Sequence, residues 1–130
     1  MSPLRNQTVL IVDDEPMVRR PVARGLTLAG FRVLQATNTA EARREIDNPM
    51  IQIDAIVLDL LLPGTPGWVL LWQLRQDAPS MPVIILTGVL SDDVDLTGAR
   101  KVLLKPIGYN SIIDALDEVL HPVTGLHPAR

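Results

Sequence analysis

Four short apolar segments of this chain each lead directly into side chains that can bind a cation or a phosphate. Carboxylates follow two of the segments, a hydroxyl follows the third and an ammonium group follows the fourth. Clustered carboxylates repel one another unless a cation lies between them, and an oxygen-only ligand set favours a hard ion such as Mg²⁺. The side chains concerned are Asp13, Asp14, Asp59, Thr87 and Lys105.

This combination of groups suits phosphoryl transfer. Lys105 offers a positive charge and Thr87 a hydroxyl donor, and both can hold the oxygens of a phosphoryl group. A carboxylate can attack phosphorus and become an aspartyl phosphate. Asp59 is the strongest candidate for this role, because it directly follows the apolar run Ala55 to Leu58.

The elements that must position these groups alternate between strand-like and helix-like patterns. This alternation predicts an α/β fold, a parallel sheet covered on both faces and right-handed crossovers. Ligands bind such sheets beyond the carboxyl ends of the strands, where all five side chains are expected. The predicted strands are 8–13, 31–36, 54–59, 82–87 and 101–104, and the predicted helices are 16–29, 39–48, 67–76 and 108–120.

Composition narrows the class of protein. The 130 residues fit one domain, and a hydrophobic content of 47% argues against disorder. There is no cysteine, no apolar run approaching the roughly 18 residues of a membrane span and no signal-peptide core, so we expect a cytoplasmic protein with no membrane partner. Direct nucleic-acid binding is not expected, because the net charge is −3 and the basic residues are scattered. Pairs such as Arg19–Arg20 are interpreted as solvated helix faces.

The order and spacing of these motifs resemble a receiver domain of two-component signalling, in the response regulator family. The resemblance predicts a receiver domain over 7–120, and 121–130 as a C-terminal tail or the remnant of a linker. It also implies a flavodoxin-like, doubly wound sheet with strand order 2-1-3-4-5. It rests on Asp13-Asp14, on Asp59 with Pro63-Gly64 and Gly67, on Thr87-Gly88, and on Gly98-Ala99 leading to Lys105-Pro106.

The resemblance also implies roles for individual residues. Asp59 is expected to be the phosphoacceptor. Asp14, Asp59 and the backbone carbonyl of Leu61 are expected to bind Mg²⁺ directly, and Asp13 mainly through metal-bound water. Lys105 should pair with Asp59 or its phosphoryl group, and the Lys105–Pro106 peptide bond should be cis. Thr87 should move toward the phosphoryl oxygens.

The implied partner is a histidine kinase or a histidine phosphotransfer protein, with a homodimer or an output partner also possible. The chain is expected to act as a signalling switch rather than as an enzyme with a separate substrate, and to lose its own phosphoryl group slowly. Leu61 and Val89 are apolar where the family has residues that influence attack by water, which predicts a long-lived aspartyl phosphate.

Other departures affect how a signal would be read. Val102 occupies a position where the family usually has an aromatic ring. The interval from Thr87 to Lys105 is about one helical turn short, which predicts a shortened or distorted fourth helix near 91–95. Trp68 and Trp72 share one helix face and are expected to be partly exposed, in a dimer or partner contact or simply covering the helix flank.

Helix 16–29 contains Pro21 and Gly25, which are unfavourable inside a helix and predict a kink near the proline. The kink either reshapes a docking surface for the phosphodonor or is tolerated strain.

Simpler readings remain for each site residue. Asp13 and Asp14 can cap the following helix, and Lys105 can be an ordinary surface lysine. The alternative function is an atypical receiver-like scaffold that is never phosphorylated and acts by protein–protein contact. A flavin or nucleotide site is disfavoured because Asp13, Asp14 and Glu15 would repel phosphate. An aspartate-dependent phosphatase is disfavoured because the chain is too short for a cap domain.

Overall fold

A five-stranded parallel sheet forms the centre of the computed structural model, which describes residues 5–90 and 92–121. The strand order β2-β1-β3-β4-β5 confirms the predicted doubly wound topology. The central strands β1, β3 and β4 are buried along their whole length, as their continuous apolar sequences predict. The strands are β1 (Thr8–Val12), β2 (Arg32–Ala36), β3 (Ala55–Leu58), β4 (Val83–Thr87) and β5 (Lys101–Leu104).

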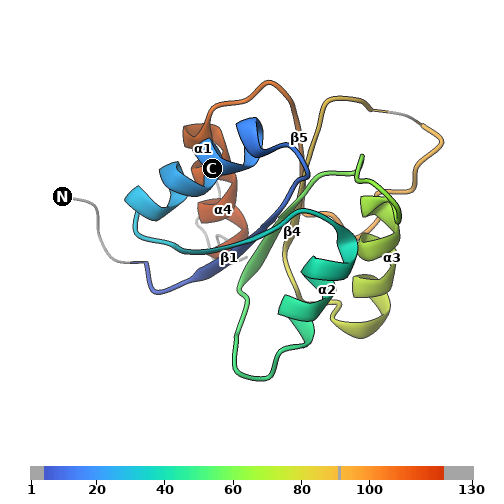
Figure 1. The fold of residues 1–130 in the computed structure, drawn as a ribbon, viewed down its shortest axis with the longest axis horizontal. Coiled ribbons are helices and arrows are strands. Elements are labelled where there is room, and N and C mark those ends of the chain that lie inside the picture. Colours follow the sequence, from blue (N-terminus) through green and yellow to red (C-terminus); the bar gives the residue numbers. More distant parts are fainter. Residues whose placement is uncertain (1–4, 91, 122–130) are drawn as a thin grey trace, which may run out of the picture.

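Within the described residues, four helices cover the two faces of this sheet, and Figure 1 shows their arrangement. One face carries α1 (Pro16–Leu28) and α4 (Tyr109–Leu120), and the other carries α2 (Thr39–Asp47) and α3 (Gly67–Asp77). Alternate residues of each strand point to opposite faces, so the sheet supports two separate cores. Leu10 and Ile56 pack with α2 and α3, whereas Val9 and Val57 pack with α1 and α4.

The segment between β4 and β5 differs from the prediction. Residues 88–90 and 92–100 form turns and bends and contain no helix, where a shortened or distorted one was expected. The carboxylate of Asp95 accepts hydrogen bonds from the backbone N–H and the hydroxyl of Thr97, so it competes for a donor that a helix would use. Gly98 has a φ of +98°, so a right-handed helix cannot continue through this position.

The absence of this helix among the described residues leaves part of one sheet face uncovered. Val102 and Leu104 lie opposite Ile85 and Thr87 of β4, on the face that carries α2 and α3. Their exposed fractions are 38% and 50%. The expected aromatic position is therefore occupied by a small apolar side chain on an open surface.

Gly25 has a packing role that its unfavourable helix propensity did not indicate. A Cβ built at Gly25 would lie 2.4–2.8 Å from ring atoms of Tyr109, so the ring of Tyr109 packs directly on the backbone of α1. Pro21 lies within α1, and the helix extends beyond it to Leu28. The contact with Tyr109 joins the start of α4 to α1.

No helix among residues 5–90 and 92–121 combines the length and apolar character that crossing a bilayer requires. Apart from His121, the expected tail at 121–130 lies outside the described residues.

Candidate functional site

Asp59 lies directly after β3, at the carboxyl edge of the sheet. Its backbone N–H donates to the carbonyl of Val12 at 2.9 Å, which continues the β1–β3 pairing to this residue. Its side chain is almost fully buried, with 3% of the residue exposed. The Leu61 N–H donates to Asp59 Oδ1 at 3.0 Å, so the carboxylate is held in one orientation.

Lys105 lies directly after β5 and forms ion pairs with the carboxylates that follow β1 and β3. Its Nζ lies 3.0 Å from Asp59 Oδ2, 2.9 Å from Asp13 Oδ2 and 3.8 Å from Glu15 Oε1. The expected contact between Lys105 and Asp59 is therefore present, and the Lys105–Pro106 bond is cis as expected. The ammonium group bridges two buried carboxylates and faces a third that is exposed.

The electrostatic environment differs between the two partners of this ion pair. Burial raises the pKa of the Asp59 carboxyl above its ordinary value, and outweighs the hydrogen bonds from Leu61 and Lys105 that lower it. Burial lowers the pKa of Lys105, but hydrogen bonds to Asp13 and Asp59 outweigh it and leave that pKa raised. Lys105 has two carboxylate partners and Asp59 has one lysine, which explains why burial prevails only at Asp59.

Four carboxylates surround the position where a cation would bind. Asp13, Asp14, Glu15 and Asp59 each place one carboxylate oxygen within 4.8 Å of the others. Asp14 and Glu15 are exposed, whereas Asp13 and Asp59 are buried. A buried wall with an open rim and only oxygen donors fits a hard divalent ion that keeps some of its water, as Mg²⁺ does. Glu15 was not among the predicted ligands, although it directly follows Asp14.

Thr87 ends β4, which pairs with the strand that precedes Asp59. Its side chain is fully buried. Its hydroxyl donates to the carbonyl of Val89 at 3.3 Å and lies 3.4 Å from the Val89 N–H. The Thr87 hydroxyl is therefore engaged with the β4–β5 segment in this structure.

Arg19 is a supporting residue that the sequence analysis misassigned. Only 7% of Arg19 is exposed, so its interpretation as part of a solvated helix face is wrong, although Arg20 is exposed. Its Nη1 donates to the backbone carbonyl of Asp13 at 2.9 Å, and its Nε to Gln35 at 3.0 Å. The available signal was its spacing from Val22, which places Arg19 on the inward stripe of the helix.

Gly67 allows the first turn of α3 to pass against the backbone of the site. A Cβ at Gly67 would lie 2.0 Å from the Asp59 carbonyl oxygen, and the Gly67 N–H donates to Leu60 at 2.9 Å. We expect Gly67→Ala to lower the free energy of unfolding by about 1–3 kcal/mol or more, because backbone atoms must move to admit the methyl group. Urea denaturation measures this loss.

Gly88→Ala is the matched control for that substitution. Gly88 directly follows β4 at the same edge of the sheet, and nothing lies within 4 Å of the Cβ that it would gain. We expect its unfolding midpoint to stay close to that of the wild type. Equal losses in the two variants would contradict the steric explanation at Gly67.

Comparison with known protein families identifies one match over most of the chain. The model described as "Response regulator receiver domain" matches residues 9–117. PhoB, the phosphate regulon transcriptional regulatory protein of Pseudomonas aeruginosa, is 35% identical over 120 residues, covering 88% of this chain and 52% of PhoB. The probable transcriptional regulatory protein TcrX of Mycobacterium tuberculosis is 37% identical, covering 87% of this chain and 49% of TcrX. The chain thus spans about half the length of these two relatives.

Solved structures show the same architecture. A receiver domain protein from Methanospirillum hungatei superposes with a TM-score of 0.83 at 25% identity, covering 88% of this chain and 94% of that one. The response regulator TrrA from Thermotoga maritima, solved in complex with Mg²⁺-BeF, gives a TM-score of 0.80 at 23% identity, covering 88% of this chain and 99% of TrrA. These superpositions agree with the strand order and the two helical layers.

Proposed function

Because the chain belongs to the response regulator receiver domain family, we propose that Asp59 accepts a phosphoryl group from a phosphohistidine and that Mg²⁺ is required for this transfer. The receiver domain extends over 7–120 in this proposal, with 121–130 as a tail or linker remnant. The observation that carries the proposal is the single ammonium group of Lys105, 2.9–3.0 Å from two buried carboxylates at one sheet edge.

The transfer follows from the positions of these groups. One Asp59 carboxylate oxygen forms a bond to phosphorus, the phosphorus–nitrogen bond of the donor breaks, and the electron pair stays on the imidazole, which then takes up a proton. The Leu61 N–H holds the Asp59 carboxylate in place during the attack. Lys105 offers its charge to the phosphoryl oxygens, and Thr87 can turn its hydroxyl from Val89 toward them.

The metal ligands in this proposal are Asp14, Asp59 and the backbone carbonyl of Leu61, with Asp13 acting through water. Bound Mg²⁺ would supply positive charge that offsets the charge of the transferring group. The four closely spaced carboxylates support this assignment, and the Mg²⁺-BeF complex of TrrA is an observation on a protein of the same fold.

Intact mass spectrometry tests the proposal directly. The full chain is incubated with acetyl phosphate and Mg²⁺, and in parallel with EDTA in place of Mg²⁺. We expect a gain of one phosphoryl mass only with Mg²⁺. No gain, together with no Mg²⁺ binding by calorimetry, would favour the alternative of a receiver-like scaffold.

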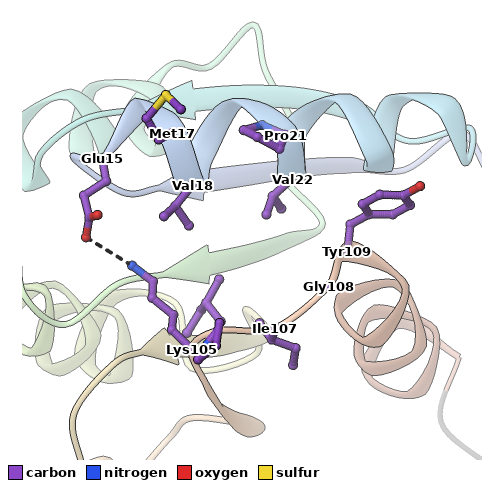
Figure 2. A pocket seen from close by; sticks show the side chains of 11 residues that line it. Glu15, Met17, Val18, Pro21, Val22, Lys105, Ile107, Gly108 and Tyr109 are labelled. Carbon is purple, nitrogen blue, oxygen red and sulfur yellow. Dashed lines mark ion pairs between the residues drawn. The ribbon is translucent and has the colours of Figure 1, made fainter.

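A groove beside the site supports the proposed phosphodonor. Its volume is about 510 Å³, and it lies between α1 and the loop that leads from Lys105 into α4. Figure 2 shows Met17, Val18, Pro21 and Val22 on the α1 side, Ile107 on the opposite side, and Tyr109 at the end beside Val22. Lys105 and Glu15, which form an ion pair, mark one end of the groove in Figure 2, and Lys105 Nζ lies 3.0 Å from Asp59 Oδ2. We propose that an apolar helix face of the histidine-bearing protein docks in this groove.

Met17→Glu separates docking from chemistry. Met17 is 85% exposed and lines the groove, and it is not one of the four carboxylate residues around the cation position. A buried charge at an apolar interface weakens association, so we expect roughly tenfold slower transfer from a phosphorylated histidine phosphotransfer protein. Transfer from acetyl phosphate should be unchanged, since this small donor needs no groove. Equal slowing with both donors would contradict this docking site.

The residues two positions after Asp59 and Thr87 are apolar, which supports a slow loss of the phosphoryl group. Leu61 and Val89 are 63% and 56% exposed, and neither side chain can orient a water molecule. We expect Leu61→Asn to speed loss of phosphate by roughly tenfold, below the ~10²–10⁴-fold of full acid–base catalysis, because an amide only positions water. Decay of the phosphorylated mass after removal of acetyl phosphate measures this rate.

Leu61→Met is the control, because it keeps an apolar side chain of similar size. Its decay rate should match that of the wild type. An unchanged or slower rate in Leu61→Asn would contradict the explanation.

Partners beyond the phosphodonor are also proposals. The relatives are transcriptional regulators about twice as long as the matched region, so an output partner or domain is proposed and direct nucleic-acid binding by this domain is not. A cytoplasmic location remains a prediction from the sequence.

A further inference from the structure

The region between α3 and the β4–β5 segment contains an apolar groove on the side of the sheet away from α1. Two adjoining hollows of about 430 and 230 Å³ form it, and Trp68 and Val94 line both. Trp72 extends one end, and Leu61 and Val89 form the other. We call this surface the tryptophan groove. It exists because residues 88–90 and 92–100 form a loop rather than a helix packed against the sheet.

Ionic and hydrogen-bonded contacts hold the outer wall of the groove in place. Nη1 of Arg75, on α3, lies 3.2 Å from the Asp95 carboxylate and donates to the Thr97 carbonyl at 3.0 Å. Hydrogen bonds from Thr97, together with Arg75, lower the pKa of Asp95 to about 2, so this carboxylate stays ionised at neutral pH. A Cβ at Gly98 would lie 2.7 Å from the side chain of Arg75, so the loop passes close to α3.

Several large apolar side chains of this groove are exposed. Trp68 and Trp72 are 43% and 52% exposed, and Leu61 and Val89 are more than half exposed. Contiguous exposed apolar residues of this size mark interaction sites, and tryptophans dominate the binding energy of such sites. The partial exposure of both tryptophans confirms that part of the sequence prediction.

The charges around the groove indicate what kind of partner fits. Asp93 and Asp95 line it together with one cationic side chain, Arg75, which already pairs with Asp95. Asp92, beside them in the sequence, is exposed. A two-fold contact between two copies would bring the same aspartates together, so the charge favours a basic partner over a second copy of this chain.

We infer that the tryptophan groove docks a basic amphipathic segment of a partner protein, with its apolar stripe against Trp68 and Trp72 and its cations near Asp93 and Asp95. We further infer that phosphorylation of Asp59 changes the affinity, a step that rests on the proposed function. Leu61 and Val89 lie two residues after Asp59 and Thr87, respectively. The Leu61 N–H donates to the Asp59 carboxylate, and the Val89 carbonyl accepts a hydrogen bond from the Thr87 hydroxyl. Movement at the site therefore reaches the groove wall.

Titration with a designed peptide tests the docking. The probe is an amphipathic helix of roughly 18 residues, five turns, with leucines on one face and lysines on the others and without tryptophan. The chain contains two tryptophans, and both lie in the groove, so a fluorescence change reports this surface alone. We expect a saturable blue shift that weakens as salt is added. A matched peptide with glutamate for lysine should give none.

Variants of the full chain test the location. By calorimetry, we expect Trp72→Ala to weaken binding more than tenfold and Asp93→Asn to weaken it about two- to fivefold, the effect of an exposed ion pair. The controls are Met50→Ala, an 89% exposed apolar residue away from the groove, and Asp114→Asn, an exposed carboxylate on α4. Neither control should change the affinity. No saturable shift, or equal binding of both peptides, would overturn the docking site.

The effect of phosphorylation is measured separately. Intact mass first shows whether acetyl phosphate and Mg²⁺ have modified the protein, and the lysine peptide is then titrated into both forms. A severalfold difference supports the coupling, and equal affinities in a fully phosphorylated sample overturn it. If no phosphoryl mass appears, the proposed function fails, while binding to the unmodified protein still decides the docking.

Discussion

Asp59→Asn is expected to abolish the gain of a phosphoryl mass when the protein is incubated with acetyl phosphate and Mg²⁺. Asparagine has no carboxylate oxygen to form the acyl phosphate, and Asp14 and Glu15 are expected to serve the cation rather than to attack phosphorus. The neighbouring carboxylate of Asp13 already bonds Lys105 and also accepts the Glu15 N–H at 3.0 Å. Time courses of intact mass for wild type and variant measure the effect.

The fold of Asp59→Asn should be retained, because the amide keeps the shape of the side chain and can still accept the Leu61 N–H. Burial raises the pKa of Asp59, so its ionised form is unfavourable in this environment, and the neutral variant should be at least as resistant to urea at pH 7. Asp47→Asn, which removes an exposed carboxylate on α2, is the control and should still be phosphorylated. Full phosphorylation of Asp59→Asn would show that another residue is the phosphoacceptor.

Lys105→Met should cause the largest loss of stability. The substitution removes the cation between two buried carboxylates, whose side chains are only 3–4% exposed. Breaking a buried ion pair on one side costs about 3–5 kcal/mol, because the remaining charges stay buried and unpaired. Urea denaturation at pH 7 in EDTA measures this loss. Added Mg²⁺ should restore much of it, since the carboxylates would again face a cation.

The pH dependence identifies the cause of that loss. A carboxyl group whose pKa is raised in the folded state stabilises the fold at low pH, and this contribution is lost as the pH rises through the folded pKa. The pKa of Asp59 is already raised and should rise further without Lys105. The deficit of Lys105→Met should therefore be largest at neutral pH and shrink as the pH falls through that pKa.

Lys105 itself does not titrate between pH 4 and pH 7. The pKa of Lys105 is raised above 10.5, so the stability that it contributes is complete below that value and is lost only in stronger alkali. Lys101→Met is the matched control, because Lys101 pairs with Glu118 at the surface and should cost about 0–1 kcal/mol. Equal deficits of Lys105→Met at pH 4 and pH 7 would contradict the electrostatic explanation.

The loss of a helix between β4 and β5 changes the surface on which a signal would be read. In this chain, Val102 and Leu104 lie on an open sheet face, and Arg75 holds the replacing loop near α3. The same loop contains Val89, which bonds the Thr87 hydroxyl. Val89 therefore links Thr87 to the tryptophan groove, because it accepts the hydrogen bond from Thr87, lies two residues after it in the chain and lines the groove.

Local patterns predicted most elements of the fold to within one or two residues. Continuous β-branched runs identified β1, β3 and β4, because strands buried on both faces have this composition. The segment near 91–95 was the failure. Its short length and acidic composition were visible, but the contact that holds the loop near α3 comes from Arg75, which lies about 20 residues away in the sequence.

The sequence by itself determined which groups stand at the strand ends, because a strand that is buried on both faces must end where polar residues begin. Asp13, Asp59 and Thr87 are predictable in this way, whereas Lys105 follows β5, a partly exposed edge strand. Only the tertiary structure decided which of them touch. It placed Lys105 between Asp13 and Asp59, buried Arg19 beneath the Asp13 carbonyl and left the Thr87 hydroxyl on Val89. Such contacts depend on strand order and side-chain packing between distant segments, which no local pattern in the chain encodes.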